Sequence, residues 1–283
     1  MIVSTIGEMK QIADDYRRNG KKIGVVPTMG YLHEGHLSLI SLAKQHADVI
    51  ITTLFVNPTQ FGPTEDFEKY PRDFERDKQL AESAGTDIFF VPSKEEMYQS
   101  DHLTSINVER ITSVLEGKIR PTHFRGVATV VGKLFNITKP HIAVFGQKDA
   151  QQTIVIQRMV KDLNFDIRII IAPTVRETDG LAMSSRNVYL STTERNESVV
   201  IYQSLQLAKR LIDEGERNCS TIISEMTKLI TSKPSAKIDY ISISDASSLE
   251  ELVTLQAGCK ILVSLATRFG ATRLIDNIIH ITK

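Results

Sequence analysis

Two histidines stand three positions apart in a short stretch that also contains two glycines. His33 and His36 lie in residues 27–36, which read Pro-Thr-Met-Gly-Tyr-Leu-His-Glu-Gly-His. Imidazole N–H groups can donate hydrogen bonds to charge that develops on phosphate oxygens. Gly30 and Gly35 allow the backbone to come close to a ligand. The residue types and their spacing therefore predict a phosphate-binding site.

The elements around this stretch support the same prediction. An apolar run over residues 23–27 predicts a buried strand, residues 28–35 a loop, and a helix is expected to open near His36. A helix N-terminus offers backbone N–H groups and the positive end of the helix dipole, and both favour a phosphate. Two histidines three apart can face one ligand there.

Zinc is the alternative ligand for a histidine pair. Metalloproteases carry His-Glu-x-x-His, whereas His33 and His36 are separated by Glu34 and Gly35 only, which is one residue short. No downstream cysteine or carboxylate pattern completes a zinc site. Phosphate is therefore favoured over zinc, with two histidines that bind nothing as the plainer alternative.

Polar side chains also follow two other predicted strands. Asn57 and Gln60 come after a strand at 49–56, and amide groups suit a substrate with hydroxyls and a carboxylate. Lys148 and Asp149 come after a strand at 142–145, where a cation suits phosphate and a carboxylate can accept from a ribose hydroxyl. In open α/β sheets ligands bind at such strand ends. The plainer alternatives are ordinary turn polarity and a solvated helix start.

Seven stretches stand out in order along the chain. Residues 27–36 are the first. The others are Phe-Val-Asn-Pro-Thr-Gln-Phe at 55–61, Tyr-Pro-Arg at 70–72, His-Phe-Arg-Gly at 123–126, Phe-Gly-Gln-Lys-Asp-Ala-Gln-Gln at 145–152, Met-Ser-Ser-Arg-Asn at 183–187 and Arg-Phe-Gly-Ala-Thr-Arg-Leu-Ile-Asp-Asn at 268–277. They span nearly the whole chain, and in this order they resemble the motifs of one family, the pantothenate synthetases (pantoate–β-alanine ligases) of the His-x-Gly-His nucleotidyltransferase superfamily. The resemblance implies ATP-dependent condensation of pantoate with β-alanine through a pantoyl-adenylate, which releases AMP and pyrophosphate.

The resemblance also implies which residues bind and act. The catalytic side chains would be His33, His36, Lys148 and Arg186. ATP would contact Met29, Gly30, Tyr31, Leu32, His33, Glu34, Gly35, His36, Gly146, Gln147, Lys148, Asp149, Val175, Met183, Ser184, Ser185 and Arg186. Pantoate would contact Gln60 and Gln152, and β-alanine would contact Gln60 and Asn57. Residues 183–186 resemble the mobile Lys-Met-Ser-Lys-Ser loop of the superfamily, with a polar interdomain linker as the alternative.

Magnesium is expected with ATP, because adenylation normally uses Mg²⁺ to bridge phosphates. Asp77 resembles the acidic position of the family after Tyr-Pro-Arg, and Asp73 is its neighbour. Arg76 lies between them, so the cluster is not fully acidic. Both carboxylates could instead only solvate a helix at 72–84.

Alternating apolar runs and helix-period segments predict an α/β fold, a Rossmann-like doubly wound parallel sheet with a smaller C-terminal α+β domain. Residues 1–174 would bind ATP and pantoate, and residues 175–283 would close over the active site. In the first domain further strands are expected at 88–91 and 167–172, and helices at 127–137 and 150–163. In the second, helices are expected at 194–214 and 221–232, and strands at 238–243, 260–267 and 273–278.

Composition excludes several classes of protein. Lys plus Arg and Asp plus Glu both number 34, so no net charge recruits nucleic acid or an anionic membrane. No apolar stretch approaches ~20 residues and no secretory leader is visible, so a cytoplasmic protein is expected. Cys219 and Cys259 form no CxxC pair and are expected to be small buried residues. The resemblance implies a homodimer.

Two further functions fit part of the pattern. A cytidylyl- or adenylyltransferase also uses a strand, glycines and His-x-Gly-His, but it keeps the nucleotide on its product. A non-catalytic nucleotide-binding regulator is disfavoured by the presence of both histidines, Lys148 and Arg186. AMP formed in step with an amide product would distinguish all three.

Overall fold

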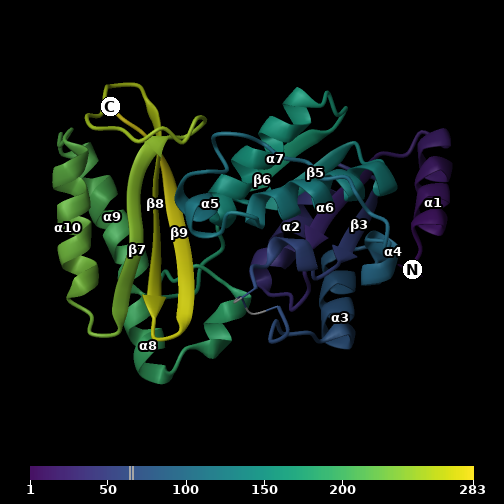
Figure 1. The fold of residues 1–283 in the computed structure, drawn as a ribbon, viewed down its shortest axis with the longest axis horizontal. Coiled ribbons are helices and arrows are strands. Elements are labelled where there is room, and N and C mark those ends of the chain that lie inside the picture. The colour runs from purple at the N-terminus through teal and green to yellow at the C-terminus, as the bar shows by residue number, and fades with distance from the viewer. Residues whose placement is uncertain (64, 66) are drawn as a thin grey trace. The chain divides into compact units, whose positions relative to one another are not determined.

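A sheet of parallel strands organises the first part of the chain. The computed structural model describes residues 1–63, 65 and 67–283, and over these residues the sheet has six strands in the order β1-β4-β3-β2-β5-β6 (Figure 1). The strands are β1 (Ile2–Val3), β2 (Ile23–Thr28), β3 (Val49–Leu54), β4 (Ile88–Phe90), β5 (Ile142–Gly146) and β6 (Arg168–Ala172). The predicted doubly wound parallel sheet is confirmed.

The direction of winding reverses beside β2. The chain passes from β2 to β3 and β4 on one side, and then returns to pair β5 with the other side of β2. A topological switch point therefore lies between the carboxyl ends of β2 and β5, which is where ligands bind in such sheets.

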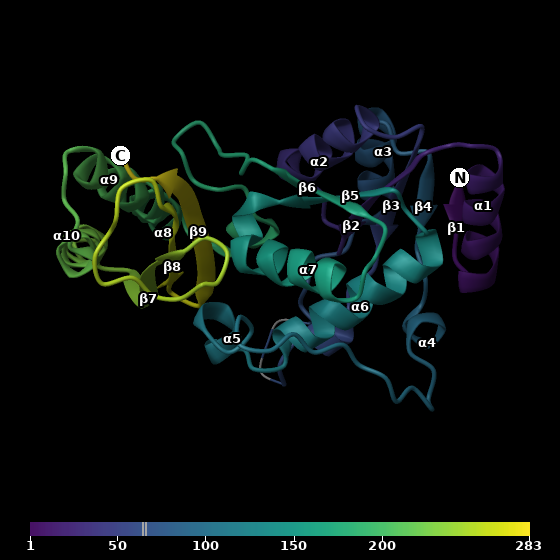
Figure 2. The same ribbon diagram turned by 90° about the horizontal axis from the view of Figure 1, so that it is seen from above.

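Helices cover both faces of this sheet. They are α1 (Ile6–Arg18), α2 (Glu34–Lys44), α3 (Phe74–Ala84), α6 (His123–Thr138) and α7 (Ala150–Asp162), with short α4 (Lys94–Met97) and α5 (Leu115–Ile119). Figure 2 shows α2 and α3 on one side of the strands and α6 and α7 on the other. Side chains in β2 alternate accordingly: Val25 packs with α1, α6 and α7, and Val26 packs with α2 and α3.

A second, antiparallel sheet follows. It consists of β7 (Ala236–Asp245), β8 (Lys260–Phe269) and β9 (Thr272–Ile281) in that order, and its helices are α8 (Thr192–Ser198), α9 (Val200–Asp213) and α10 (Cys219–Thr231). Leu205, Ile222, Val263 and Phe269 are fully or almost fully buried together between α9, α10 and one face of the sheet. Figure 1 shows α9 and α10 alongside these strands.

The described chain divides into two units that do not follow one simple cut. Unit 1 comprises Met1–Gln147 and Gln151–Pro173, and unit 2 comprises Lys148–Ala150 and Thr174–Lys283. Lys148 and Asp149 from the connection between β5 and α7, together with Ala150, the first residue of α7, therefore belong to unit 2.

Several element boundaries differ from the sequence-based expectation. The helix after β2 begins at Glu34, two residues early, because His33 itself caps it. The helix expected at 194–214 is two helices that meet at Val199. Helix α1 was not expected from the sequence, although its N-cap Thr5 and its buried Met9 and Ala13 carry a helical signal.

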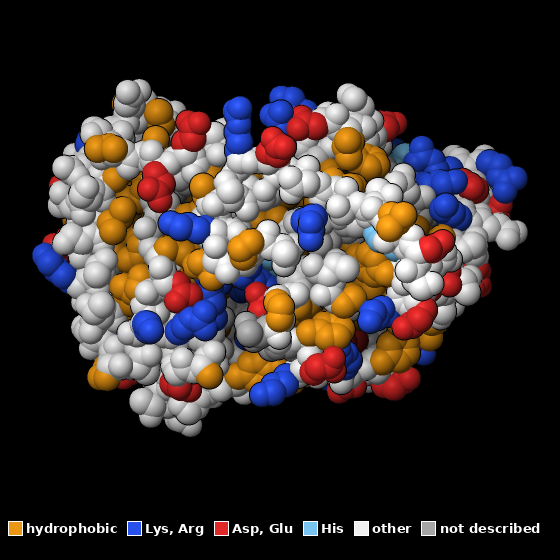
Figure 3. Space-filling view, in the orientation of Figure 1, with side chains coloured by type: hydrophobic (Ala, Val, Ile, Leu, Met, Phe, Trp, Pro, Cys, Tyr) orange, Lys and Arg blue, Asp and Glu red, His pale blue; other side chains and the backbone are white. Residues whose placement is uncertain are grey.

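The surface mixes charges of both signs. On the face shown in Figure 3, Lys and Arg side chains are distributed among Asp and Glu side chains. Within the residues that the structure describes, no helix combines the length and the apolar character that crossing a membrane requires.

Candidate functional site

The two histidines of the predicted phosphate site lie at the start of α2. Nδ1 of His33 accepts the N–H of Gly35 at 3.1 Å, and Nδ1 of His36 accepts the N–H of His33 at 3.3 Å. The ring centroids are 4.2 Å apart. Because an accepting Nδ1 carries no hydrogen, this network assigns the hydrogen of each neutral ring to Nε2. Both rings can therefore donate from Nε2 to an anionic ligand.

The loop before these histidines has an unusual backbone that a buried carboxylate holds. Gly30 and Tyr31 both have positive φ, 86° and 51°, and this conformation costs a non-glycine residue on the order of 1 kcal/mol. Asp77 Oδ2 accepts the N–H of Tyr31 and Asp77 Oδ1 accepts that of Leu32, each at 2.6 Å. The φ of Gly30 favours glycine, and a Cβ there would also lie 3.0 Å from Asp77 Oδ2, a tight contact that would press on this carboxylate.

Arg76 also contacts this loop, through Leu32 and Tyr31. Its Nη1 donates to the carbonyl of Leu32 at 2.9 Å, and its guanidinium lies 5.3 Å from the ring centroid of Tyr31. Asp77 is only 2% exposed. Burial raises the pKa of Asp77 above its ordinary value, and the two N–H groups and Arg76 oppose that rise. Arg76 and Asp77, near the start of α3, thus hold the histidine loop in its conformation.

The predicted magnesium ligand, Asp77, already has partners within the protein. Both of its oxygens accept backbone N–H groups, and a guanidinium nitrogen of Arg76 lies 3.7 Å from Oδ1. In the described part of the chain, no group of three or more His, Cys, Asp or Glu side chains is arranged to hold a metal ion. Asp77 thus anchors the histidine loop, and its role as a magnesium ligand stays a prediction.

The two amides after β3 are buried and joined. Asn57 is 1% exposed and Gln60 is 8% exposed. Nδ2 of Asn57 donates to Gln60 Oε1 at 3.2 Å and to the carbonyl of Gly126 at 3.1 Å. Oδ1 of Asn57 accepts the N–H and hydroxyl of Thr59 and the hydroxyl of Tyr98. Both the NH₂ group and the oxygen of the Asn57 amide are therefore bonded within the protein. The bond from Asn57 Nδ2 to Gln60 Oε1 orients the Gln60 side chain.

Gln60 reaches the histidine loop. Its Nε2 lies 2.9 Å from the sulfur of Met29, a weak acceptor that a stronger one can displace. The main-chain carbonyl of Gln60 accepts a hydrogen bond from Nδ1 of His123 at 2.9 Å. The predicted pantoate amide thus lies against a residue of the predicted ATP loop.

His123 is a half-buried, neutral histidine to which the sequence assigned no role. Since Nδ1 donates to Gln60, Nε2 is the acceptor for Nη1 of Arg120 at 3.3 Å. Burial, reinforced by Arg120, lowers the pKa of His123 to about 4. Arg120 also binds both oxygens of Glu65 at 2.6 Å. Burial raises the pKa of Glu65, but Arg120 outweighs that effect and leaves it below its usual value.

Two adjacent glutamines at the start of α7 have separate roles. Gln151 is buried, and its amide is bonded to the backbone of Glu116, Ile111 and Val114. Gln152, the predicted pantoate ligand, is half-buried, and its side chain has no hydrogen bond to the described residues. Gln152 is therefore the one of the pair whose amide can serve a ligand.

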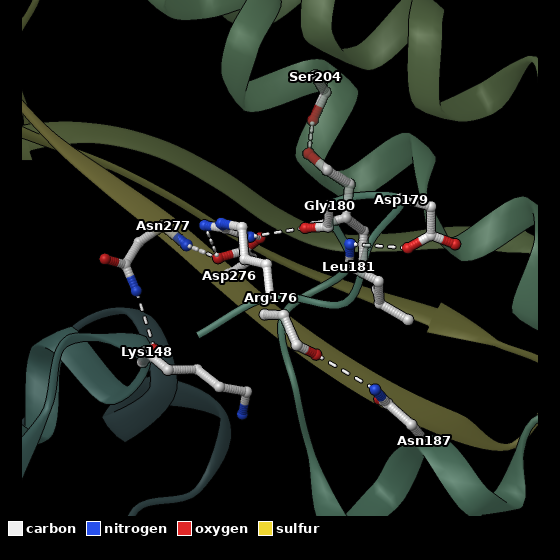
Figure 4. Close-up of polar contacts among 11 residues, drawn as sticks. Lys148, Arg176, Asp179, Gly180, Leu181, Asn187, Ser204, Asp276 and Asn277 are labelled. Carbon is white, nitrogen blue, oxygen red and sulfur yellow. Dashed lines mark hydrogen bonds and ion pairs between the residues drawn. The ribbon is translucent and has the colours of Figure 1, made fainter. Parts of the chain in front are cut away.

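In unit 2, the predicted phosphate loop at residues 183–186 follows a turn that hydrogen bonds and ion pairs hold. Residues 175–183 fold back on themselves, with Met183 N–H donating to the carbonyl of Val175. Arg195 of α8 binds Asp179 at 2.7 Å and Glu177 at 2.6 Å, and Asn187 donates to Glu177 at 2.8 Å. Figure 4 shows this turn, in which Asp179 also accepts the N–H of Leu181.

Glycine is required at the tip of that turn. Gly180 has φ 97°, and a Cβ there would lie 2.1 Å from the ring of Tyr202. After the turn, Ser184 caps the 3-10 helix η3 (Ser185–Tyr189) by accepting the N–H of Arg186 at 3.2 Å. Ion pairs from Arg195 thus hold the turn that precedes the 183–186 segment.

The comparisons with known proteins agree with this geometry. The family model for Pantoate-beta-alanine ligase matches residues 1–279. A pantothenate synthetase from Chloroherpeton thalassium is 56% identical over 277 residues, which cover 98% of each chain. The chain belongs to the pantoate–beta-alanine ligase family.

Solved structures of family members have the same fold. A pantothenate synthetase from Thermus thermophilus superposes with a TM-score of 0.92 at 42% identity, covering 98% of each chain. A pantoate–beta-alanine ligase from Francisella tularensis, solved with Beta-gamma ATP and Beta-alanine, superposes with a TM-score of 0.80 at 36% identity, covering 99% of this chain and 97% of that one. The resemblance seen in the sequence motifs is thereby confirmed at the level of the family.

The predicted site residues of the ligase are shared between the units. Met29, Gly30, His33, His36 and Gly146 follow or end β2 and β5, the strands on either side of the switch point. Lys148, Val175 and the 183–186 segment belong to unit 2. Two groups received no role from the sequence: the set of Glu65, Arg120 and His123, and the polar residues Asp276 and Asn277 in β9. His123, Asp276 and Asn277 lie in motifs quoted above, and a pair of polar residues within an apolar strand is a further signal for the second group.

Proposed function

We propose that this protein carries out the reaction for which its family is named, the ATP-dependent ligation of pantoate to β-alanine. The observation that carries the proposal is the contact between Gln60 Nε2 and Met29 Sδ at 2.9 Å. This contact places the Gln60 amide, which suits a hydroxy acid, next to the loop that precedes His33 and His36. The Nε2–H groups of these two histidines suit a phosphate. A hydroxy acid and a nucleotide phosphate bound there would be neighbours.

The first step in this proposal forms an adenylate. A carboxylate oxygen of pantoate attacks the α-phosphorus of ATP, the bond from that phosphorus to the bridging oxygen breaks, and pyrophosphate leaves. Negative charge spreads over the phosphate oxygens as it does so. His33, His36, Lys148 and Arg186 supply hydrogen-bond donors and positive charge for it. No covalent protein nucleophile is required.

The second step forms the amide. The neutral amine of β-alanine attacks the activated carbonyl carbon, the bond from carbon to the AMP oxygen breaks, and AMP leaves while the nitrogen loses a proton. Gln60 and Gln152 would hold pantoate through amide donors and acceptors. Asn57 would act on β-alanine through Gln60, because its own amide is bonded to Gln60 and Gly126.

Magnesium, closure and assembly complete the proposal. Mg²⁺ would arrive with ATP and be held mainly by phosphates and water, as this ion commonly is. Residues 175–283 would close over the site once ATP binds. We also propose a cytoplasmic homodimer, which light scattering at micromolar concentration and cell fractionation would check.

A product assay tests the function. ATP, pantoate and β-alanine are incubated with the protein, and pantothenate and AMP are measured by mass spectrometry. Both should accumulate in equal amounts and only with all three substrates. A nucleotide retained on the product would indicate a nucleotidyltransferase, and no turnover would indicate a non-catalytic binder.

An exchange assay tests the order of steps. Labelled pyrophosphate should enter ATP when pantoate is present and β-alanine is absent, since the adenylate forms before the amine is needed. ADP in place of AMP, or exchange that requires β-alanine, would contradict the adenylate route.

A further inference from the structure

The main chain at Lys148 is bonded to the last strand of the protein. Nδ2 of Asn277 in β9 donates to the carbonyl oxygen of Lys148 at 2.8 Å, across 129 residues of sequence. Asn277 is 4% exposed, so little water competes for its amide. Figure 4 shows the Lys148 side chain extending away from this bonded carbonyl.

Asn277 is itself held by its neighbours. Its N–H donates to Asp276 Oδ1 at 2.8 Å. Asp276 pairs with two guanidinium nitrogens of Arg176, at 2.5 and 3.0 Å, and is 2% exposed. Arg176 in turn donates to the carbonyl of Gly180 and lies 4.1 Å from the ring centroid of Tyr202.

These contacts fix both faces of β9 at one point. Successive side chains of a strand point to opposite faces, so Asp276 faces Arg176 and Asn277 faces the turn of Lys148. Burial raises the pKa of Asp276, and the Arg176 guanidinium opposes that rise. Each face is thus held by a polar contact, and β9 cannot shift by one residue without losing both.

We infer that Asn277 is a positioning residue for Lys148. A lysine has a flexible four-carbon stem, so the place its ammonium can reach is set by where its backbone is held. Lys148 lies in the 3-10 turn η2 (Gln147–Asp149), and the bond from Asn277 holds the carbonyl in the middle of that turn. The inference rests on the role proposed for Lys148 in stabilising phosphate charge.

The first test measures the anchor without activity. Asn277→Ala and the nearly isosteric Asn277→Asp, which replaces the donor by an acceptor, are compared with Ser264→Ala. Ser264 is paired with Asn277 across the sheet, and its buried hydroxyl has no hydrogen-bond partner among the described residues. We expect amide hydrogens of residues 148–150 to exchange about tenfold faster in both Asn277 variants and at the wild-type rate in Ser264→Ala.

The second test links the anchor to Lys148. Asn277→Ala should slow pantoate-dependent exchange of pyrophosphate into ATP about tenfold. In a Lys148→Ala background it should slow residual exchange no further, while the faster hydrogen exchange persists, because the carbonyl is still there. Multiplying effects in the double variant, or unchanged hydrogen exchange, would overturn the inference.

Two other outcomes are also decisive. Loss of cooperative melting in both Asn277 variants would overturn the inference, because the residue would then serve folding as a whole. The wild type could show no pyrophosphate exchange while residues 148–150 exchange hydrogen faster in the Asn277 variants. That result would overturn the proposed function and the positioning role of Asn277 in it, but it would leave the structural anchor between Asn277 and Lys148 in place.

Discussion

The loop that carries the histidines and the turn that precedes Met183 are both held firmly, but by different contacts. In unit 1, Asp77 is 2% exposed and binds backbone N–H groups, and the histidines bind through neutral rings. In unit 2, Arg195 bridges Glu177 and Asp179, whose side chains are 31% and 40% exposed.

The difference determines which conditions disturb each region. Buried hydrogen bonds to the backbone are insensitive to salt, but each lost partner leaves an unsatisfied group. Partly exposed ion pairs contribute little individually and weaken as salt rises. The histidine loop should therefore respond strongly to single substitutions, and the turn in unit 2 should respond weakly and with a salt dependence.

The largest effect is expected at the histidines. His36→Ala should slow pyrophosphate exchange about a hundredfold, roughly 3 kcal/mol, because it removes a donor to phosphate charge. His33→Asn should do the same while keeping a good N-cap, which separates chemistry from capping. His46→Ala, an exposed residue beyond the end of the same helix, is the control. Wild-type exchange in either variant would remove the assignment.

A pH experiment addresses His123, the half-buried histidine of unit 1 whose pKa is lowered. His123 titrates at about 4 when folded and near 6.5 when unfolded, so from pH 7 to pH 5 the unfolded chain takes up a proton that the folded chain does not. The free energy of unfolding should fall as pH falls, by about 2 kcal/mol over this range. Urea unfolding of the wild type and of His123→Gln measures it. An equal loss in both proteins would contradict the low pKa.

The same pH range should spare the ion pairs of unit 2. Arg195 lowers the pKa of Asp179 below its ordinary value, so that carboxylate stays charged over this pH range. The ion pair between Arg195 and Asp179 is therefore not expected to add acid sensitivity between pH 7 and pH 5.

Asp77→Asn sharpens the comparison by testing the loop anchor. Asparagine has one acceptor oxygen and would turn its NH₂ toward a backbone N–H, so a stability loss of between about 1 and 2 kcal/mol is expected. Thermal melting and a magnesium titration of activity measure it, with exposed Glu75→Gln on the same helix as the control. The magnesium concentration for half-maximal activity should not change. A tenfold increase would identify Asp77 as a metal ligand instead.

The smallest effect is expected at Arg195. Arg195→Gln removes both ion pairs of the turn, but the partners are partly exposed, so less than about 1 kcal/mol should be lost. The difference from the wild type should shrink between about 0.02 M and 0.5 M salt. Melting at both salt concentrations checks this, and a salt-independent loss would show that packing holds the turn.

The sequence predicted the parallel sheet, and a histidine stretch between a strand and a helix, because these depend on local patterns. Apolar runs of strand length, helix-period segments and the glycines around His33 all lie within short windows. The structure has the parallel sheet and places His33 and His36 after β2, at the start of α2. The position of the helix start was missed by two residues, because a histidine served as its cap.

What the sequence could not predict are contacts between distant residues. Asp77 reaches Leu32 across 45 residues, and Asn277 reaches Lys148 across 129. The spacing of Asn57 and Gln60 suggested two substrate amides, but the burial of Asn57 and its bond to Gly126 come from the packing of α6. Such roles depend on which elements fold against each other.

The bond between Asn277 and Lys148 also has a consequence for biosynthesis. Asn277 lies in β9, so a ribosome must translate through that strand before this contact can form. The parallel sheet can assemble earlier, since its last strand ends at Ala172. A chain that ends before β9 would lack the donor for the Lys148 carbonyl even where its parallel sheet has formed. The anchoring of the Lys148 turn is therefore completed only when the last strand has been made.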